Sequence, residues 1–217
     1  MKIFVIGATG MAGSAFVKEA NKHGLEIIAN GRQTDKLAKL QAKVPNIQIL
    51  AKDAFTLTKD DFTDCDVIVD AFSTAPSQAY RHTDLAAHLV ALFRETTKPR
   101  LAFILGAGSL VTGPDHHRVL HDIEQDDTTK PWRNTPKNQY FEYQFLQNVD
   151  NVNWFGISPA NLFIPGEQAA KILTGKDELL YNDAGESITT AGTMAAALVA
   201  EILQPQHRQE RFTVANG

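Results

Sequence analysis

Short, nearly continuous apolar runs alternate along the chain with segments whose apolar positions recur at helical spacing. Such continuous runs are typical of central strands that are buried on both faces of a sheet. The predicted strands cover residues 3–6, 25–29, 47–51, 67–69, 101–105, 154–158 and 211–215. The predicted helices cover residues 11–23, 34–43, 81–95, 138–148 and 194–204. Because strands and helices alternate, the pattern predicts an α/β fold, a doubly wound parallel sheet with helices on both faces.

The rhythm changes after Pro159. The stretch KDELLYNDAGESITT, residues 176–190, predicts short strands around a glycine-containing turn, and the Ala-rich helix that follows ends at Pro205. The chain has 217 residues without an internal repeat, a low-complexity tract or a linker. This length is typical of one doubly wound domain. We therefore expect a single domain over residues 1–217, in which the residues from about 160 onward contribute a small cap on the substrate side.

Composition and charge exclude several classes of protein. The formal net charge of −4 argues against a binder of nucleic acid or of acidic membranes, which would carry a basic excess. Cys65 is the single cysteine, so one chain can form neither a disulfide nor a zinc–thiolate cluster. No run approaches the roughly 18–20 apolar residues of a membrane-spanning helix, and the first apolar run is too short for a signal peptide. We expect a cytoplasmic protein, monomeric or homodimeric, that acts on a small molecule.

The first predicted strand runs directly into three glycines spaced three apart. Gly7, Gly10 and Gly13 follow this strand and open a helix. In that context the first glycine permits a tight turn, the second lets the backbone approach a phosphate, and the third lets helix and strand pack closely. Free N–H groups at the helix start would face a pyrophosphate. The pattern predicts a dinucleotide site, although an ordinary glycine-rich turn would also explain it. Further residues expected beside the cofactor are Thr9, Met11 and Ala12.

The end of the second strand bears on which dinucleotide binds. NAD sites usually carry Asp or Glu there, whereas this chain reads Asn30, Gly31, Arg32. Arg32 could form a bidentate pair with a 2′-phosphate, and Lys36 could add a second positive charge. These two positive charges favour NADP(H) over NAD(H). The alternative is that Arg32 is a solvated loop residue and Lys36 a surface residue, neither of which binds a phosphate. Asp53, just past the third strand, is placed either to meet the adenine edge or to serve as a turn residue.

The motifs IGATGMAGS, the GR after the second strand and the KDAF after the third resemble the atypical short-chain dehydrogenase/reductase group. More narrowly, these motifs and the closing pattern ISPANLFIPGE … KDELLYNDAGESIT … ERFTVANG resemble its small NAD(P)H-binding, NmrA-like members described as NADH-flavin reductases. The chain is similar, more distantly, to flavin and biliverdin-IXβ reductases. The resemblance covers nearly the whole chain and implies a Rossmann fold with NAD(P)H at the carboxyl ends of the first four strands.

The resemblance also implies where each part of the cofactor lies. It assigns the 2′-phosphate to Arg32 and the adenine side to Asp53. The adenosine ribose would lie beside the segment after the fourth strand: Ala71, Phe72 and Ser73. The nicotinamide would lie between the loop 106–109 and the segment 158–161. The cofactor contacts implied there are Gly106, Ser158, Pro159 and Asn161.

One departure from the wider superfamily concerns the catalytic pair Tyr-x-x-x-Lys. Tyr140 is followed four residues later by Gln144, and Tyr143 by Gln147, so classical alcohol dehydrogenation is not expected. Hydride transfer to a flavin needs close stacking and correct distance, and a reduced flavin can take its proton from water. The candidate catalytic residues are Ser109 and Tyr140. Aromatic side chains that could line a flavin pocket are Phe72, Trp132, Tyr140 and Phe163.

The first functional hypothesis is therefore an NAD(P)H-dependent reductase of a free flavin or a similar planar acceptor. The second is a non-catalytic, redox-sensing regulator of the NmrA type, which holds the nucleotide without turning it over. A third, an isomerase of nucleotide sugars, is disfavoured by the missing Tyr–Lys pair and by the small C-terminal part. His116, His117 and His121 could suggest a metal site, but no H-E-x-x-H motif is present, and a polar mobile loop explains them as well. The acidic stretch 121–127 is interpreted as solvated loop, and we expect no bound metal.

Overall fold

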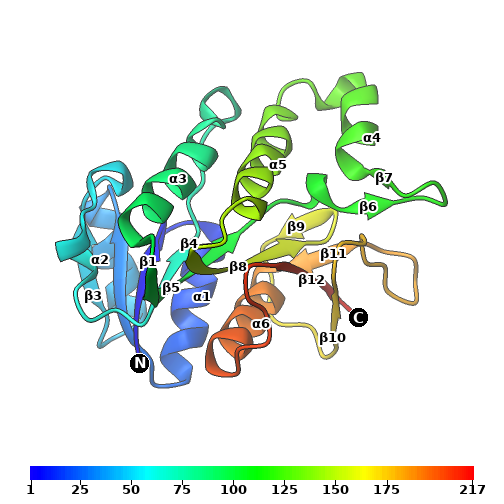
Figure 1. Ribbon diagram of the computed structural model, residues 1–217. Coiled ribbons are helices and arrows are strands. Elements are labelled where there is room, and N and C mark those ends of the chain that lie inside the picture. The colour runs from blue at the N-terminus through cyan, green and yellow to red at the C-terminus, as the bar shows by residue number, and fades with distance from the viewer.

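The apolar runs of the sequence form one eight-stranded sheet in the computed structural model, which describes all 217 residues (Figure 1). The strands lie in the order β10-β12-β8-β5-β4-β1-β2-β3. All neighbouring pairs are parallel except β10 and β12. The bounds are β1 Lys2–Ile6, β2 Glu26–Gly31, β3 Gln48–Ala51, β4 Val67–Asp70, β5 Thr96–Ile104, β8 Val152–Pro159, β10 Ile172–Gly175 and β12 Arg211–Asn216. The chain leaves β1 for β2 on one side and returns to β4 on the other, so the sheet reverses its winding between β1 and β4.

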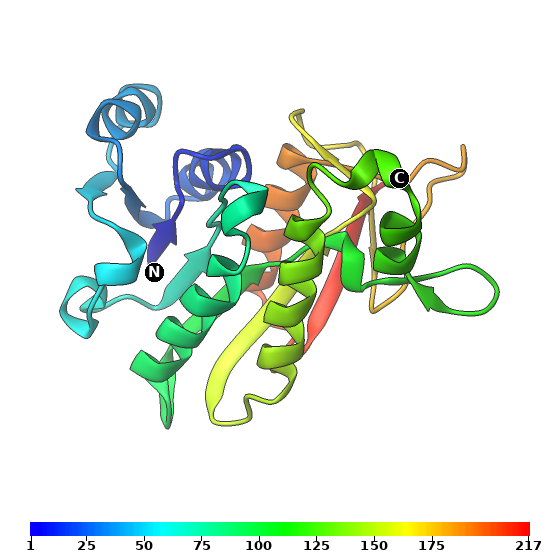
Figure 2. The same cartoon turned by 90° about the horizontal axis from the view of Figure 1, so that it is seen from above.

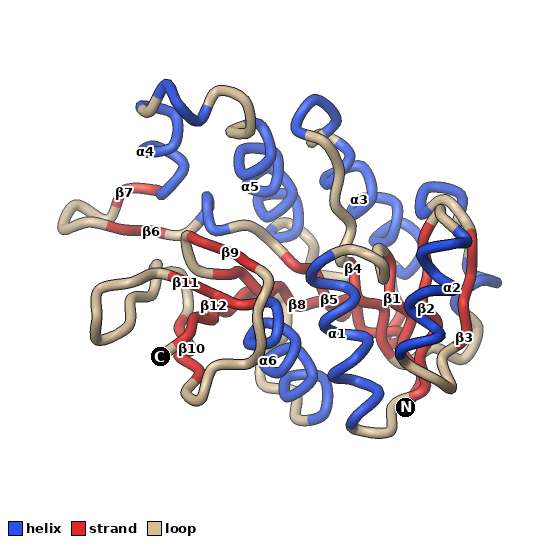
Figure 3. Tube along the Cα trace, turned by 180° about the vertical axis from the view of Figure 1, so that it is seen from behind, coloured by secondary structure: helices blue, strands red, loops and turns tan.

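Two layers of helices cover the sheet (Figures 1 and 3). The helices of one layer are α1 Met11–Lys22, α2 Thr34–Lys43 and α6 Ala191–Leu203. Those of the other layer are α3 Arg81–Phe93 and α5 Asn134–Gln147, which lie side by side in the view from above (Figure 2). None of the helices is both long enough and apolar enough to cross a membrane.

Alternate residues of the central strands face the two helical layers. In β1, Ile3 and Val5 belong to the core with α1, α2 and α6, whereas Phe4 and Ile6 belong to the core with α3 and α5. This double burial explains why the strands read as continuous apolar runs rather than as alternating patterns. The predicted doubly wound parallel sheet is confirmed.

Short elements lie over the carboxyl ends of the strands. The strands are β6 Val111–Thr112, β7 His117–Arg118, β9 Leu162–Ile164 and β11 Ile188–Thr190, and the helix is α4 Val119–Gln125. The 3-10 turns cover Ala54–Thr56, Lys59–Phe62, Pro76–Gln78, Ala107–Ser109 and Asp127–Thr129. Of the segment expected to form a cap, β9 and β11 lie outside the main sheet, whereas β12 pairs with β8 and α6 packs on α1. Residues 160–217 therefore contribute β10, β12 and α6 to the main sandwich as well as the short strands β9 and β11 outside it.

Three local predictions were wrong. Residues 121–125, interpreted as solvated loop, belong to α4, because the buried Val119 and Leu120 anchor its first turn. Helix α5 begins at Asn134 rather than at 138, since Pro136 in the first turn costs no hydrogen bond. Of the short strands predicted over residues 176–190, only β11 at Ile188–Thr190 forms, and the predicted glycine-containing turn is present at Gly185. Residues 176–187 are a loop, in which the Asn182 side chain accepts hydrogen bonds from the Ala184 and Glu186 amides at 3.0 and 2.9 Å.

Candidate functional site

The loop between β1 and α1 is built on glycines for two different reasons. Gly7 has a φ of +71°, and a Cβ there would lie 2.4 Å from the Ala71 carbonyl oxygen. A Cβ on Gly13 would lie 2.3 Å from the Gly7 oxygen, so the start of α1 packs directly on the loop. Gly10 has ordinary extended dihedrals, and its only close neighbour would be the Gly7 oxygen at 3.3 Å. The backbone at position 10 therefore does not itself require glycine. The missing side chain instead leaves open space in front of the start of α1.

Three amides in the first turn of α1 have no partner within the protein. Gly10 gives the helix no side-chain cap, and the first turn carries no acidic residue. The amide of Gly10 bonds to the Gly7 oxygen at 3.0 Å and that of Ser14 to the Gly10 oxygen at 2.9 Å, whereas those of Met11, Ala12 and Gly13 find no acceptor. Unpaired N–H groups at the positive end of a helix dipole attract an anion such as a diphosphate.

A first hollow of about 220 Å³ opens at the carboxyl ends of β1, β2 and β4. It lies at the point where the sheet reverses its winding, which is where open α/β sheets bind ligands. The predicted cofactor residues that line it are Gly7, Thr9, Gly10, Arg32, Lys36, Asp53, Ala71, Phe72 and Ser73. The sequence reasoning missed the others: Ile6, Gly31, Gln33, Ala54 and Arg81.

The charges around the first hollow are mainly positive. Arg32, Lys36 and Arg81 line it, and none of them forms an ion pair. The Arg81 guanidinium lies 4.2 Å from the centre of the Phe55 ring. Asp53 is the one carboxylate, and its Oδ1 accepts a hydrogen bond from the Phe55 amide at 3.0 Å. Asp53 is thus a turn residue that also faces the hollow. Three unpaired cations against one carboxylate suit an anionic ligand.

A second hollow of about 290 Å³ adjoins the first and shares Gly10, Ala71, Phe72 and Ser73 with it. Its walls are the loop after β5, the start of α5 and the segment between β8 and β9. The other predicted residues that line it are Met11, Ala12, Gly106, Trp132, Pro159, Asn161 and Phe163. Residues of its lining that the sequence reasoning missed include His82, Ile123, Pro136 and Gln139.

Four predicted residues line neither hollow. Gly13 packs under the loop, and the Ser158 hydroxyl donates a hydrogen bond to the Gly106 oxygen at 3.0 Å. Ser109 is buried, and its hydroxyl accepts a hydrogen bond from Arg211 at 2.7 Å. The Arg118 guanidinium lies 5.8 Å from the centre of the Tyr140 ring. Ser109 and Tyr140, the candidate catalytic residues, therefore lie outside the lining of both hollows.

Arg211 of β12 holds the loop after β5 in place. Its buried guanidinium donates to the Ser109 hydroxyl and, at 3.3 Å, to the Ser158 hydroxyl, and it forms an ion pair with Asp177. It also lies 4.2 Å from the centre of the Tyr143 ring on α5. The loop that forms one wall of the second hollow is thereby tied to three neighbouring elements, which fixes its position.

Three buried titratable groups lie at or behind the second hollow, and no pattern in the sequence indicates them. Burial raises the pKa of Asp70 at the end of β4, against a hydrogen bond from the Phe72 amide at 2.9 Å. Burial and the charge of Asp70 raise the pKa of Glu142 on α5. Burial lowers the pKa of His82 on α3 to about 4. Perturbed groups beside a hollow are typical of functional sites.

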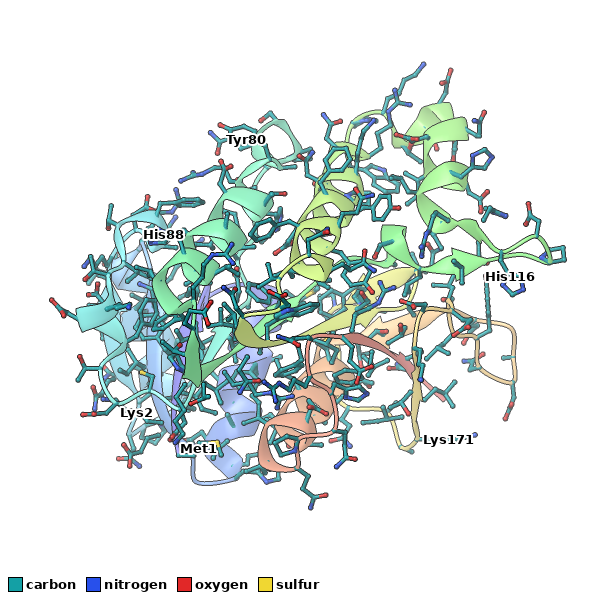
Figure 4. All side chains as sticks on the ribbon, in the orientation of Figure 1. Met1, Lys2, Tyr80, His88, His116 and Lys171 are labelled. Carbon is teal, nitrogen blue, oxygen red and sulfur yellow. The ribbon has the colours of Figure 1, made fainter.

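The histidines at 116–121 lie on the β6–β7 hairpin and α4 rather than on a mobile loop. His116 lies toward the tip of the hairpin (Figure 4), with a φ of +54°. The His117 ring lies between Asp115 and Asp122, at 2.6 and 2.9 Å, and hydrogen bonds to these carboxylates raise its pKa. No group of three or more His, Cys, Asp or Glu side chains in the chain has the geometry to hold a metal ion.

A Rossmann-type sheet with unpaired helix amides at its switch point defines a dinucleotide-binding protein. Comparison with known proteins identifies the family within this class. The model of the NAD(P)H-binding family matches residues 7–205, and the chain belongs to this family. The predicted family resemblance is thereby confirmed.

Three similar proteins match this chain over its whole length. The uncharacterized protein YwnB of Bacillus subtilis strain 168 is 34% identical over 100% of this chain and 99% of its own. A protein of Lactobacillus casei has a solved structure that is 38% identical, with a TM-score of 0.92 and 100% of both chains covered. SP1627 of Streptococcus pneumoniae TIGR4, described as "a putative NADH-flavin reductase", is 31% identical, with a TM-score of 0.88 over 100% of both chains.

Proposed function

We propose that the protein is an NADPH-dependent reductase that transfers hydride to a free flavin or a similar planar acceptor. The observation that carries this proposal is the pair of adjoining hollows: the first is cationic, and the second is lined by aromatic side chains and by Met11 and Ala12, whose amides are unpaired. The similarity to SP1627 over the full chain supports the same class of reaction.

The residues of the first hollow, together with the start of α1 where the two hollows adjoin, fit a dinucleotide phosphate. The amides of Met11 and Ala12 would bind the diphosphate, and Arg32 and Lys36 would bind a 2′-phosphate. Ala71 and the two residues after it would contact the adenosine ribose. Bound NADPH supplies a hydride; the chain itself binds the coenzyme, orients it and forms the walls of the acceptor site.

The second hollow suits a flat, partly polar ring. Phe72, Trp132 and Phe163 offer apolar surface for stacking, and Asn161 and Gln139 offer amide groups that orient a polar edge. Without a Tyr–Lys pair on α5, the reaction relies on the proximity and orientation of the two reactants.

Turnover with added acceptors tests the proposal. We expect purified protein to oxidise NADPH when FMN, riboflavin or a quinone is present. If NADPH and NADP⁺ bind with comparable affinity but none of these acceptors is reduced, the reductase function is wrong, and an NmrA-type redox sensor takes its place.

Arg32→Ala should weaken NADPH binding selectively. Loss of a charge-assisted contact to the 2′-phosphate costs about 1–3 kcal/mol, and NADH has no such phosphate. Calorimetric titration of both coenzymes measures this difference. Arg208→Ala is the matched control, because Arg208 is also exposed and unpaired but lines neither hollow. Equal losses of affinity for NADPH and NADH would show that Arg32 does not bind the 2′-phosphate.

Trp132→Ala should raise the KM of the acceptor with little effect on NADPH affinity. Trp132 is 47% exposed and lines the second hollow, so its stacking on a flat ring contributes about 0.5–1.5 kcal/mol, roughly 2- to 10-fold in KM. Phe141→Ala is the control, since Phe141 is 45% exposed but lies outside the hollow. Steady-state kinetics with FMN in which both variants match the wild type would exclude stacking on Trp132.

A further inference from the structure

The second hollow has no charged side chain in its lining. Asp, Glu, Lys and Arg make up 21% of the chain, yet none of the residues that line this hollow is of these four types. The one titratable side chain in the lining is that of His82, and burial lowers its pKa to about 4, so the imidazole is neutral at pH 7. The adjoining first hollow, by contrast, is lined by Arg32, Lys36 and Arg81. The two hollows therefore suit ligand groups of different charge.

The lack of charge extends beyond the lining itself. Most of the lining comes from four stretches of the chain without Asp, Glu, Lys or Arg: residues 3–17, 71–80, 101–114 and 151–166. Burial in the sheet explains the strands within these stretches. It does not explain their loops, which reach the surface at Met11, Ser73 and Asn161, where charged residues are common. An acceptor in the second hollow thus meets no cation on these sides.

The remaining wall, from α4 to the start of α5 (Figure 1), carries cations that are bonded to neighbouring groups. Lys130 pairs with Asp127 at 2.7 Å, and Lys137 pairs with Glu124 at 2.9 Å. The arginines of this wall each donate to a backbone carbonyl oxygen, Arg118 at 2.6 Å and Arg133 at 3.4 Å. None of these four cationic side chains lines the hollow. This wall therefore offers no unpaired lysine to an anionic acceptor.

The bound coenzyme would add negative charge where the two hollows adjoin. In the proposed binding mode its diphosphate lies against the amides of Met11 and Ala12, and both residues also line the second hollow. A phosphate or carboxylate on the acceptor would be repelled by this diphosphate. It would also lose hydration without gaining a partner. An uncharged ring incurs neither cost and still stacks on the aromatic wall.

We propose that the acceptor is an uncharged planar molecule, either a flavin without a phosphate or a quinone without an acidic group. FMN and other anionic acceptors are then the poorer substrates. This inference rests on the proposed reductase function and narrows its substrate class.

Riboflavin and FMN are the matched pair for the test, because they share one ring system and differ by one phosphate. At about 0.01 M ionic strength we expect kcat/KM for riboflavin to exceed that for FMN at least about 10-fold. The difference should narrow toward about 1 M, because the Debye length falls from about 30 to 3 Å. A naphthoquinone and its sulfonate provide the same comparison for a quinone acceptor.

A cation placed in the lining should reverse the preference. Thr135 is half-buried and lines the second hollow from the first turn of α5. We expect Thr135→Lys to raise the ratio of kcat/KM for FMN to that for riboflavin about 10-fold. Thr135→Gln is the control, since glutamine has a similar length without the charge, and it should keep the wild-type ratio.

The outcomes separate this inference from the reductase function. If the wild type reduces FMN as efficiently as riboflavin, or the sulfonate as efficiently as the parent quinone, the inference is wrong while the reductase function stands. A preference for riboflavin that responds neither to salt nor to Thr135→Lys would also contradict it. If the wild type reduces no acceptor, the reductase function is wrong. Fluorescence titration of riboflavin and FMN with the NADP⁺-bound protein then decides the inference: tighter binding of riboflavin supports it, and any other result overturns it.

Discussion

Replacing Gly10 with aspartate is expected to abolish NADPH binding while leaving the fold at least as stable as that of the wild type. Gly10 is the N-cap of α1 and has ordinary extended dihedrals, which aspartate adopts without strain. Aspartate is a preferred N-cap because its carboxylate accepts hydrogen bonds from the first helix amides. The carboxylate would then occupy the position proposed for the diphosphate and repel it. We expect affinity to fall at least about 100-fold, ~2.7 kcal/mol.

Gly10→Ala is the control for this prediction. Its methyl group adds no charge, and its one close neighbour is the Gly7 oxygen at 3.3 Å, so a small shift accommodates it. NADPH titration and thermal unfolding of both variants separate charge from bulk. Unchanged affinity in Gly10→Asp would mean that the start of α1 does not bind the coenzyme. A large loss of stability in that variant would contradict the description of the loop.

Glu201→Gln is expected to cause a large loss of stability. The Glu201 carboxylate on α6 is 5% exposed and pairs with the Arg100 guanidinium, which itself lies 3.9 Å from the Phe155 ring centre. It also accepts hydrogen bonds from the His207 amide and ring at 3.1 and 2.8 Å. Removal of one partner from such a buried pair costs about 3–5 kcal/mol, because it leaves the other charge uncompensated.

The same carboxylate makes stability depend on pH. Burial opposes ionisation of Glu201, but the hydrogen bonds from Arg100 and His207 outweigh it and lower the pKa below the ordinary value of a glutamate. A lowered folded-state pKa contributes stability above the unfolded value, and this contribution is lost as the pH falls through the folded value. Urea unfolding should therefore show the difference between wild type and Glu201→Gln at pH 7 and a smaller difference below about pH 4.

Glu210→Gln is the matched control for this stability prediction, because Glu210 is exposed and its carboxylate is unpaired. We expect it to unfold within about 0.5 kcal/mol of the wild type. A loss of less than about 1 kcal/mol in Glu201→Gln at pH 7 would show that the buried pair contributes little to the attachment of α6.

The sheet and the glycine loop were predictable from the sequence because their signals are local. A strand buried on both faces is a continuous apolar run, and Gly7 and Gly13 are required by contacts within the same strand–loop–helix unit. Local signals failed where a few buried residues decide the structure. Val119 and Leu120 anchor a short helix within an otherwise polar stretch, and charge alone suggested a loop.

The second hollow was only partly predictable because distant segments build it. His82 and Glu142 are 60 residues apart and face each other only because α3 and α5 pack side by side (Figure 2). Arg81 meets the first hollow only because β4 lies next to β1 in the sheet. No spacing in the sequence encodes these encounters. Ser109 was chosen for its residue type, and its burial against Arg211 follows from the strand β12 at the far end of the chain.

A crystal structure with NADPH tests most directly whether the start of α1 is the coenzyme site. We predict that the diphosphate lies against the amides of Met11 and Ala12, with the 2′-phosphate at Arg32 and the nicotinamide directed into the second hollow. Coenzyme bound elsewhere, with those amides still free, would contradict the account.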